Sequence, residues 1–307
     1  MGHGHHHHTG DAEVAGNRRR LAMALAFTAT YMIAEIVGGL AANSLALLAD
    51  AGHMFSDAAA LGLSLVAVVL AQRPATSNRT YGFHRAEILA ALTNGAALLT
   101  LSVLIAREAW ERLFEPPEVR GGLLLAVACG GLVINLINLL ILSGGRHHNL
   151  NVRGAWLHVM ADTLGSIGAI SAGGAIYFFG WTWADPIASF VIATLVLYSA
   201  GGLIRETLHV LMEGVPKGIS IDEVSDALKA IPGVLDAHDL HVWSLTSGRN
   251  IATTHLVIGE DADHQSIIDA ANRTLADQFA IAHATIQVEH DELANKCNPC
   301  GPTPAVG

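Results

Sequence analysis

Two histidine–aspartate pairs have the same spacing within long apolar stretches of the chain. His53 and Asp57 lie in residues 44–64, and His158 and Asp162 follow about a hundred residues later. Residues four apart share one face of a helix, so each pair places an imidazole and a carboxylate about one turn apart. Two nitrogens and two carboxylate oxygens form a closed four-ligand set that suits tetrahedral Zn²⁺.

The competing interpretation is a polar seam between packed helices. An ionisable side chain in hydrocarbon costs at least ~2.5–3.5 kcal/mol, so it normally faces a partner, a cavity or an ion. A seam would explain one pair, but two pairs in two apolar stretches favour a binding site. Asp50 lies one turn before His53, and we expect it to support the site rather than bind the ion. Glu35 is ambiguous between proton handling and an interhelical bond. Small neighbours would let the helices approach closely: Gly52, Ala58, Ala59, Gly165 and Gly168.

The elements that carry these pairs are predicted to cross a membrane. Of 307 residues, 51% are hydrophobic and only 14% are charged, whereas ordinary soluble domains have about 25% charged residues. A span needs about 20 apolar residues. The apolar runs predict an α-helical membrane domain of six transmembrane helices, at about residues 21–40, 44–71, 87–105, 121–142, 155–179 and 186–204.

Six spans place both termini on the same side of the membrane. The basic residues concentrate on that side, in residues 18–20, 72–85 and 143–153. The positive-inside rule therefore predicts a multi-pass protein of the inner (plasma) membrane with both termini in the cytoplasm.

The sequence pattern changes after Met212. A helix at 219–231 that Ser220 can cap, strands at 234–245 and 250–258, a helix at 264–279 and a strand at 284–289 predict a small α+β module. The α-β-β-α-β order is expected to form an antiparallel or mixed sheet in a ferredoxin-like arrangement. Residues 213–307 contain 14 acidic and 5 basic residues, which makes the module acidic and argues against nucleic-acid binding.

These patterns divide the chain into four parts. We expect a His-rich flexible N-terminus at 1–18, the membrane domain at 19–212, a cytoplasmic metal-binding dimerisation domain at 213–292 and a CxxC tail at 293–307. The His-rich start has the composition of either an engineered tag or a native metal-collecting tail.

The chain resembles the cation diffusion facilitator family, in particular its zinc-type bacterial branch. The resemblance covers almost the whole chain and is most specific in the segments SLALLADAGHMFSD, TYGFHRAEILAAL, LNVRGAWLHVMADTLGS, LMEGVP and HDLHVWSLTSG. It implies a homodimer that exchanges cytoplasmic Zn²⁺ for external protons by alternating access. It also assigns the family's transport site to His53, Asp57, His158 and Asp162.

The resemblance implies further metal positions outside the membrane domain. The cytoplasmic positions of the family match best at His238, His255, His264 and His290, while His241 either substitutes or packs, and His283 is the weakest candidate. His84 matches one position of a loop site, with His147 and His148 as looser entrance-side candidates.

The C-terminal Cys297 and Cys300 form a CxxC pair whose thiolates suit Zn²⁺. A redox pair or a loose tail is the alternative for these two residues, and cytoplasmic placement disfavours a standing disulfide.

Other functions remain as alternatives. The same mechanism could move Cd²⁺ or Co²⁺, or Ni²⁺, Fe²⁺ or Mn²⁺, although an all-carboxylate site would suit the harder Mn²⁺ and Fe²⁺ better. A metal-sensing membrane protein is a second possibility. A membrane metalloenzyme would need an open coordination position and a general base. No span contains HExxH or a Ser/Lys arrangement, so we expect no enzyme activity and no organic cofactor.

Overall fold

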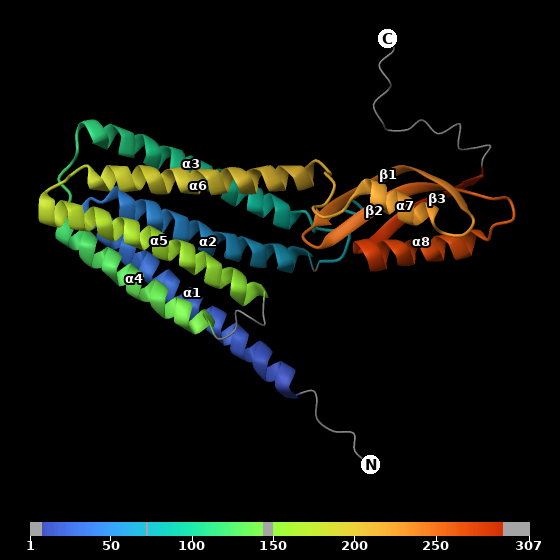
Figure 1. Cartoon of the computed structure of the whole chain (residues 1–307), viewed down its shortest axis with the longest axis horizontal. Coiled ribbons are helices and arrows are strands. Elements are labelled where there is room, and N and C mark those ends of the chain that lie inside the picture. Colours follow the sequence, from blue (N-terminus) through green and yellow to red (C-terminus); the bar gives the residue numbers. More distant parts are fainter. Residues whose placement is uncertain (1–7, 72, 144–149, 291–307) are drawn as a thin grey trace, which may run out of the picture. The chain divides into compact units, whose positions relative to one another are not determined.

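Six long helices, two shorter helices and three strands make up the described part of the chain (Figure 1). In this computed structural model the described residues are 8–71, 73–143 and 150–290. The long helices are α1 (His8–Ala42), α2 (Leu45–Ala71), α3 (Ala86–Phe114), α4 (Gly121–Ser143), α5 (Leu150–Phe179) and α6 (Ala184–Leu211). The contacts divide the chain into a helical unit, residues 1–62 with 93–202, and a C-terminal unit, residues 63–92 with 203–307.

Five helical segments are long and apolar enough to cross a membrane: Leu21–Ala42, Ala86–Phe114, Gly121–Ser143, Ala155–Phe179 and Ala184–Leu211. The predicted sixth span is a helix of 27 residues, α2. Among the described residues, α2 does not belong to the five candidate spans. The number of six spans therefore stays a prediction.

Helices α1, α3 and α6 are longer than the sequence predicted. Arg107 and Glu108 lie inside α3 rather than after it, because they form ion pairs one turn along the helix. The Arg107–Glu111 and Arg112–Glu108 pairs both measure 2.9 Å between nitrogen and oxygen, and i,i+4 pairs of this kind stabilise a helix. Likewise α1 begins at His8, within the segment predicted to be flexible.

Helix α2 packs against two groups of helices in the helical unit. Its Leu47 lies in a buried apolar cluster with Ala128 of α4 and Ala169 of α5. Its Leu45 and Ala49 lie in another cluster with Ile105 and Ala109 of α3 and Ala193 of α6. The helix that carries His53 and Asp57 is therefore fixed on two sides.

Two buried asparagines of α4 bridge neighbouring helices. Asn135 Nδ2 donates to Ser166 Oγ of α5 at 3.1 Å, and Asn138 Nδ2 donates to Thr28 Oγ1 of α1 at 3.1 Å. Interhelical bonds of this kind help to hold transmembrane helices together. Cys129 of the same helix is exposed.

The small residues near the paired motifs do not all serve close packing. A Cβ at Gly52 would lie 2.6 Å from Leu101 Cδ2, so α2 and α3 approach closely there. Gly168 has no atom within 4 Å of such a Cβ. The prediction of close packing is therefore wrong for Gly168, which borders a cavity instead.

The C-terminal module comprises α7 (Ile221–Lys229), β1 (Val234–Thr246), β2 (Arg249–Ile258), α8 (His264–Phe279) and β3 (Ile281–His290). The predicted α-β-β-α-β order is confirmed. The sheet order is β1-β2-β3, with β1 antiparallel and β3 parallel to β2, so of the two expected kinds of sheet, antiparallel or mixed, the module has the mixed one. Its apolar core includes Val224 and Leu228 of α7, Leu256 of β2 and Leu275 of α8.

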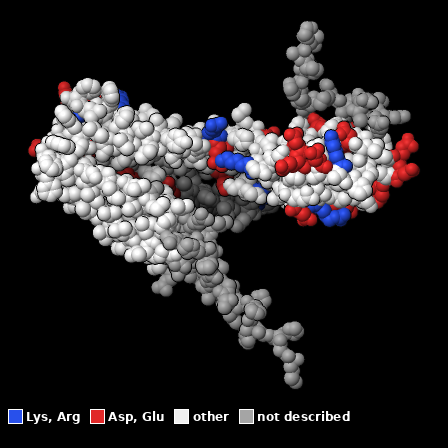
Figure 2. Space-filling model, viewed as in Figure 1, with Lys and Arg blue, Asp and Glu red and all other residues white. Residues whose placement is uncertain are grey.

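The caps of α7 and α8 follow from the sequence. Ser220 accepts from the backbone N–H of Glu223 at the start of α7, as predicted. Asp263 accepts from the N–H and the hydroxyl of Ser266 at the start of α8. These bonds satisfy N–H groups that the first turn of a helix leaves unpaired. Figure 2 shows charged side chains gathered over the C-terminal module, whereas the long helices are mostly uncharged on this face.

Candidate metal centre

The two sequence motifs meet inside the helical unit. His53 and Asp57 lie on α2, with Nε2 and Oδ2 3.6 Å apart, and His158 and Asp162 lie on α5 with the same separation. The pairs also cross between helices. His158 Nε2 lies 3.1 Å from Asp57 Oδ2, and His53 Nε2 lies 3.9 Å from Asp162 Oδ1.

The four side chains have the spacing of a small-ion site. Ligand atoms of His53, His158 and Asp162 lie within 4.8 Å of one another, and Asp57 approaches both imidazoles. Tetrahedral Zn²⁺ with ligands at about 2.0 Å would separate neighbouring ligand atoms by about 3.3 Å. The observed 3.1–3.9 Å between nitrogens and oxygens needs only small side-chain adjustments to reach that geometry.

The site is partly shielded from solvent. The Asp162 side chain is 12% exposed and the His53 side chain 25%, whereas the His158 side chain is 45% exposed. Nδ1 of His53 is buried and accepts or donates no hydrogen bond within the described part of the chain. This nitrogen is not the one that faces the carboxylates, since Nε2 lies 3.6 Å from Asp57 Oδ2 and 3.9 Å from Asp162 Oδ1.

A cavity of about 1190 Å³ leads away from the four residues. Asp50, His53, His158 and Asp162 line one part of it. The remaining lining follows α5 past Gly168 and α6 past Ile187, as far as Trp181 in the α5–α6 connection. The cavity therefore connects His53, His158 and Asp162 with the end of the helices where α5 and α6 are joined.

The two additional acidic residues have different positions. Asp50 is 8% exposed and lines the cavity, and a Cβ on Gly165 of α5 would lie 3.7 Å from its Oδ1. It thus lies between α2 and α5 next to the ligands, which suits the supporting role predicted for it. Glu35 of α1 is 1% exposed and, among the described residues, is not part of the cavity lining.

A second cluster lies in the C-terminal module. His238 of β1 and His255 of β2 are paired across the antiparallel strands, with ring centroids 5.2 Å apart. Glu289 of β3 reaches both rings, with Oε1 2.8 Å from His255 Nδ1 and Oε2 3.5 Å from His238 Nε2. The carboxylate is 3% exposed, so this charge is buried against two imidazoles.

Asp239 connects a third histidine to this cluster. Its Oδ1 lies 3.1 Å from His241 Nε2, and its Oδ2 lies 3.9 Å from His255 Nε2. Asp239 has a φ of +49°, a backbone conformation that Asp adopts more readily than most residues. This residue falls at the register shift between His238 and His241 in the β1–β2 pairing.

The remaining predicted ligands have other surroundings. The His264 and His290 rings are tilted by 45° to each other with centroids 5.3 Å apart, outside the three-residue cluster. His283 contacts the Tyr81 ring. His84 Nε2 lies 2.7 Å from the Arg249 guanidinium, and a bound cation there would have to displace it. His147, His148, Cys297 and Cys300 lie outside the described residues.

Two acidic residues of the C-terminal cluster, Asp239 and Glu289, are not among the ligands predicted from the sequence. Glu289 ends the strand predicted at 284–289, and Asp239 directly follows the candidate ligand His238. Glu289 comes near the histidines only through the register of β3 against β2, which no local sequence pattern gives. In parallel β2–β3 pairing, His255 lies opposite Gln287, which makes Glu289 its diagonal neighbour, and diagonal side chains lie within reach of one another.

Known proteins are similar to the chain over nearly its full length. Residues 21–212 match the cation efflux transmembrane domain, and residues 216–291 match the cation efflux protein cytoplasmic domain. A cadmium, cobalt and zinc/H(+)-K(+) antiporter of Bacillus subtilis is 42% identical over 306 residues, 96% of each chain.

Two further relatives have similar coverage. The metal cation efflux system protein CzcD of Cupriavidus metallidurans is 43% identical over 94% of this chain and 90% of its own length. The zinc transporter ZitB of Escherichia coli is 42% identical over 94% of this chain and 93% of its own length. Because both domain families and these relatives match, the chain belongs to the cation efflux (cation diffusion facilitator) family, whose members are membrane transporters rather than enzymes.

Proposed function

We propose that this transporter exports Zn²⁺ from the cytoplasm in exchange for protons, with His53, Asp57, His158 and Asp162 as the transport site. The observation that carries the proposal is the crossed contact of the two motifs, in which the His158 imidazole faces Asp57 at 3.1 Å. Two imidazoles and two carboxylates are a ligand set that Zn²⁺ readily accepts. In this proposal the metal is cargo, so the site has to release it as well as bind it.

Proton exchange follows from the chemistry of the ligands. An imidazole has an unperturbed pKa near ~6.5 and must be neutral at the coordinating nitrogen to bind a metal. Metal binding therefore releases protons from the site, and protons compete with the metal when the site faces an acidic compartment. If the site faces one side of the membrane at a time, this competition couples metal efflux to proton entry.

The cavity supports one conformation of such a cycle. It extends from His53 and His158 to Trp181, in the connection between α5 and α6. We place both termini in the cytoplasm on the basis of the basic residues in the N-terminal segment and in two loops. If α2 also crosses the membrane, there are six spans and the α5–α6 connection lies on the outer side of the plasma membrane. In this proposal the cavity opens the transport site to that outer side.

We further propose that the chain acts as a homodimer and that the C-terminal module binds Zn²⁺ through His238, His255 and Glu289. The module is acidic, with 14 Asp/Glu against 5 Lys/Arg in residues 213–307. Two such modules would repel each other, and a bound cation would reduce this repulsion. The ferredoxin-like description of the module and the ligand roles of His241, His264 and His290 stay predictions.

Cd²⁺ and Co²⁺ are the alternative cargo. Co²⁺ accepts the same tetrahedral set, and the Bacillus subtilis relative is named for cadmium, cobalt and zinc. Transport of each metal in competition with Zn²⁺ would rank the three.

The proposal can be tested with purified protein in liposomes that contain a zinc-sensitive dye and experience a pH gradient. The wild-type chain should move Zn²⁺ against the proton flow. Asp57→Ala and Asp162→Ala should abolish this flux without changing the amount of folded protein. Asp222→Ala, an exposed site on α7, is the matched control. Retained transport in both site variants would refute the assignment.

A further inference from the structure

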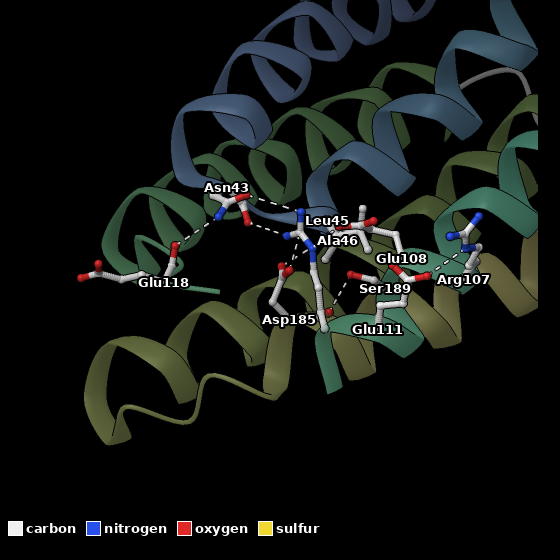
Figure 3. A network of polar contacts seen from close by, with 10 residues as sticks. Asn43, Leu45, Ala46, Arg107, Glu108, Glu111, Glu118, Asp185 and Ser189 are labelled. Carbon is white, nitrogen blue, oxygen red and sulfur yellow. Dashed lines mark hydrogen bonds and ion pairs between the residues drawn. The ribbon is translucent and has the colours of Figure 1, made fainter. Parts of the chain in front are cut away.

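A buried carboxylate outside the metal centre joins the first turns of α2 and α6. Asp185, the second residue of α6, is fully buried. Its Oδ2 accepts from the backbone N–H of Leu45 at 2.9 Å, and its Oδ1 accepts from that of Ala46 at 3.3 Å. Ser44 Oγ also donates to Oδ1 at 2.5 Å. Figure 3 shows the carboxylate directed at the start of α2.

These bonds form a strong local connection. The first N–H groups of a helix have no intrahelical acceptor, and the positive end of the helix dipole favours an anion. A charged acceptor makes hydrogen bonds roughly twice as strong as a neutral one. Because the carboxylate belongs to α6 rather than to α2, the cap ties residues of two helices that lie 139 or more positions apart along the chain.

The short turn between α1 and α2, next to the Asp185 carboxylate, has further hydrogen bonds to neighbouring helices and loops. Arg112 of α3 donates through Nη1 to the backbone carbonyl of Asn43 at 3.0 Å. Asn43, whose φ is +55°, donates through Nδ2 to the Glu118 carbonyl at 3.4 Å (Figure 3). The first turn of α2 thus has fixed contacts to α3, to the α3–α4 connection and to α6.

Both connected helices line the cavity of the metal centre. Helix α2 contributes Asp50 and His53, and α6 contributes Ala184, Ile187 and Val191. At a rise of about 1.5 Å per residue, His53 lies about 12 Å along α2 from Leu45. A change in the angle between α2 and α6 would therefore open or narrow the cavity while the Asp185 end stays in place.

We infer that Asp185 is a positioning residue for transport, a pivot that fixes the start of α2 against α6 while the rest of the two helices changes separation around the ion. This inference builds on the proposed alternating-access cycle. Asp185 itself does not touch the ion, since within the described residues it belongs neither to the ligand cluster nor to the cavity lining. Its loss should slow the conformational step and leave the ligands intact.

The test is a comparison of Asp185→Asn, Ser44→Ala and the double variant in the zinc-flux liposomes. The Asn side chain keeps the shape but loses the charge, and weakening charge-assisted bonds of this strength should lower turnover by about tenfold. We expect the KM for Zn²⁺ and calorimetric Zn²⁺ binding in detergent to stay within about twofold. Ser44→Ala should give a smaller loss, and the double variant should lose less than the product of the two effects.

Ser189→Ala is the matched control. Ser189 Oγ donates to the backbone carbonyl of Asp185 at 2.6 Å and is equally buried, so its removal leaves the carboxylate connection intact and should leave turnover unchanged.

A second measurement reads the conformational step directly. In a background with Cys129, Cys297 and Cys300 replaced by Ser, an Ala188→Cys variant places a thiol on the α6 wall of the cavity. Its labelling by an impermeant maleimide should change with Zn²⁺ when Asp185 is present. In Asp185→Asn that change should be largely lost.

The outcomes separate this inference from the proposed function. A wild-type chain that moves no Zn²⁺ would refute the transport proposal before Asp185 is considered. If Asp185→Asn had the turnover of the wild type, the pivot role of Asp185 would be refuted and the transport proposal would stand. If Asp185→Asn lowered turnover, Zn²⁺ binding and the yield of monodisperse protein together, the carboxylate would serve folding alone, and the inference would also be wrong.

Discussion

The imidazole of His158 on α5 lies closer to Asp57 of α2, at 3.1 Å, than to Asp162 on its own helix, at 3.6 Å. The proposed metal centre is therefore built across two helices rather than from two separate helical pairs. Such a site depends on the separation of α2 and α5, and that separation is what a transport cycle can change.

This contact predicts strong coupling between Asp57 and His158 in metal binding. Loss of an outer-shell partner alone costs about 10–100-fold in metal affinity. Asp57→Asn or His158→Gln, which removes a direct ligand, should therefore cost at least about 100-fold. The double variant should lose clearly less than the sum of the two free energies, because either change already disrupts the shared site. Calorimetric Zn²⁺ titration of the wild type, the two single variants and the double variant measures the coupling free energy between Asp57 and His158. Additive losses of binding free energy would contradict a shared ion.

The residues of the proposed centre could be picked out from the sequence because their spacing is a local property, while their role as ligands stays a prediction. An i,i+4 pair on a helix is visible without knowing which helices are neighbours. The order of helices and strands in the C-terminal module was also predictable, because alternating strands and capped helices are local patterns. Helix ends were less predictable, since the ion pairs of Arg107 and Arg112 extend α3 beyond its apolar run.

Contacts that depend on tertiary packing could not be predicted. Asp185 follows a Trp-rich connection and looks like an ordinary first-turn acid of α6, and no local pattern indicates that it caps α2 instead. Glu289 required the register of β3 against β2, which a one-residue error would reverse. His84 matched a family metal position, yet its contact with Arg249 depends on how the 73–85 loop meets the β1–β2 turn.

Replacing one imidazole by a carboxylate should change metal preference. His53→Asp converts the set of two nitrogens and two oxygens into one nitrogen and three oxygens. Carboxylate ligands suit the harder Mn²⁺ better than imidazole does. The variant should therefore lose Zn²⁺ transport relative to Mn²⁺ transport, which paired flux measurements with the two metals determine. An unchanged ratio would show that His53 does not contact the ion.

The cap of α8 predicts a local pH dependence. Hydrogen bonds from the hydroxyl and the N–H of Ser266 lower the pKa of Asp263 below its usual value. A lowered folded-state pKa means that the cap contributes fully above the unfolded pKa of about 3.9 and is lost as pH falls through the folded pKa. Hydrogen exchange in the first turn of α8 should accelerate, after correction for chemical rates, when the chain is moved from pH 6 to pH 3.

Asp263→Asn is the control for this effect, because an amide caps a helix and does not titrate. In this variant the protection of the first turn of α8 should change little between the two pH values. If the variant and the wild type responded alike, the pH dependence would have a source other than the cap.

The C-terminal cluster predicts a separate, removable metal site. Glu289→Gln keeps the volume of the buried side chain but removes the charge that faces His238 and His255. We expect calorimetry of the full chain in detergent to show one Zn²⁺ fewer per chain than in the wild type. Binding at the membrane centre should persist, because its residues lie on α2 and α5, outside the C-terminal module.

Glu260→Gln is the matched control, an exposed acid just after β2 that makes the same change in net charge. It should leave the stoichiometry unchanged. Full Zn²⁺ stoichiometry in Glu289→Gln would mean that the buried carboxylate only balances the charge of its histidine neighbours. A reduced stoichiometry in both variants would instead assign the extra ion to the general acidity of the module.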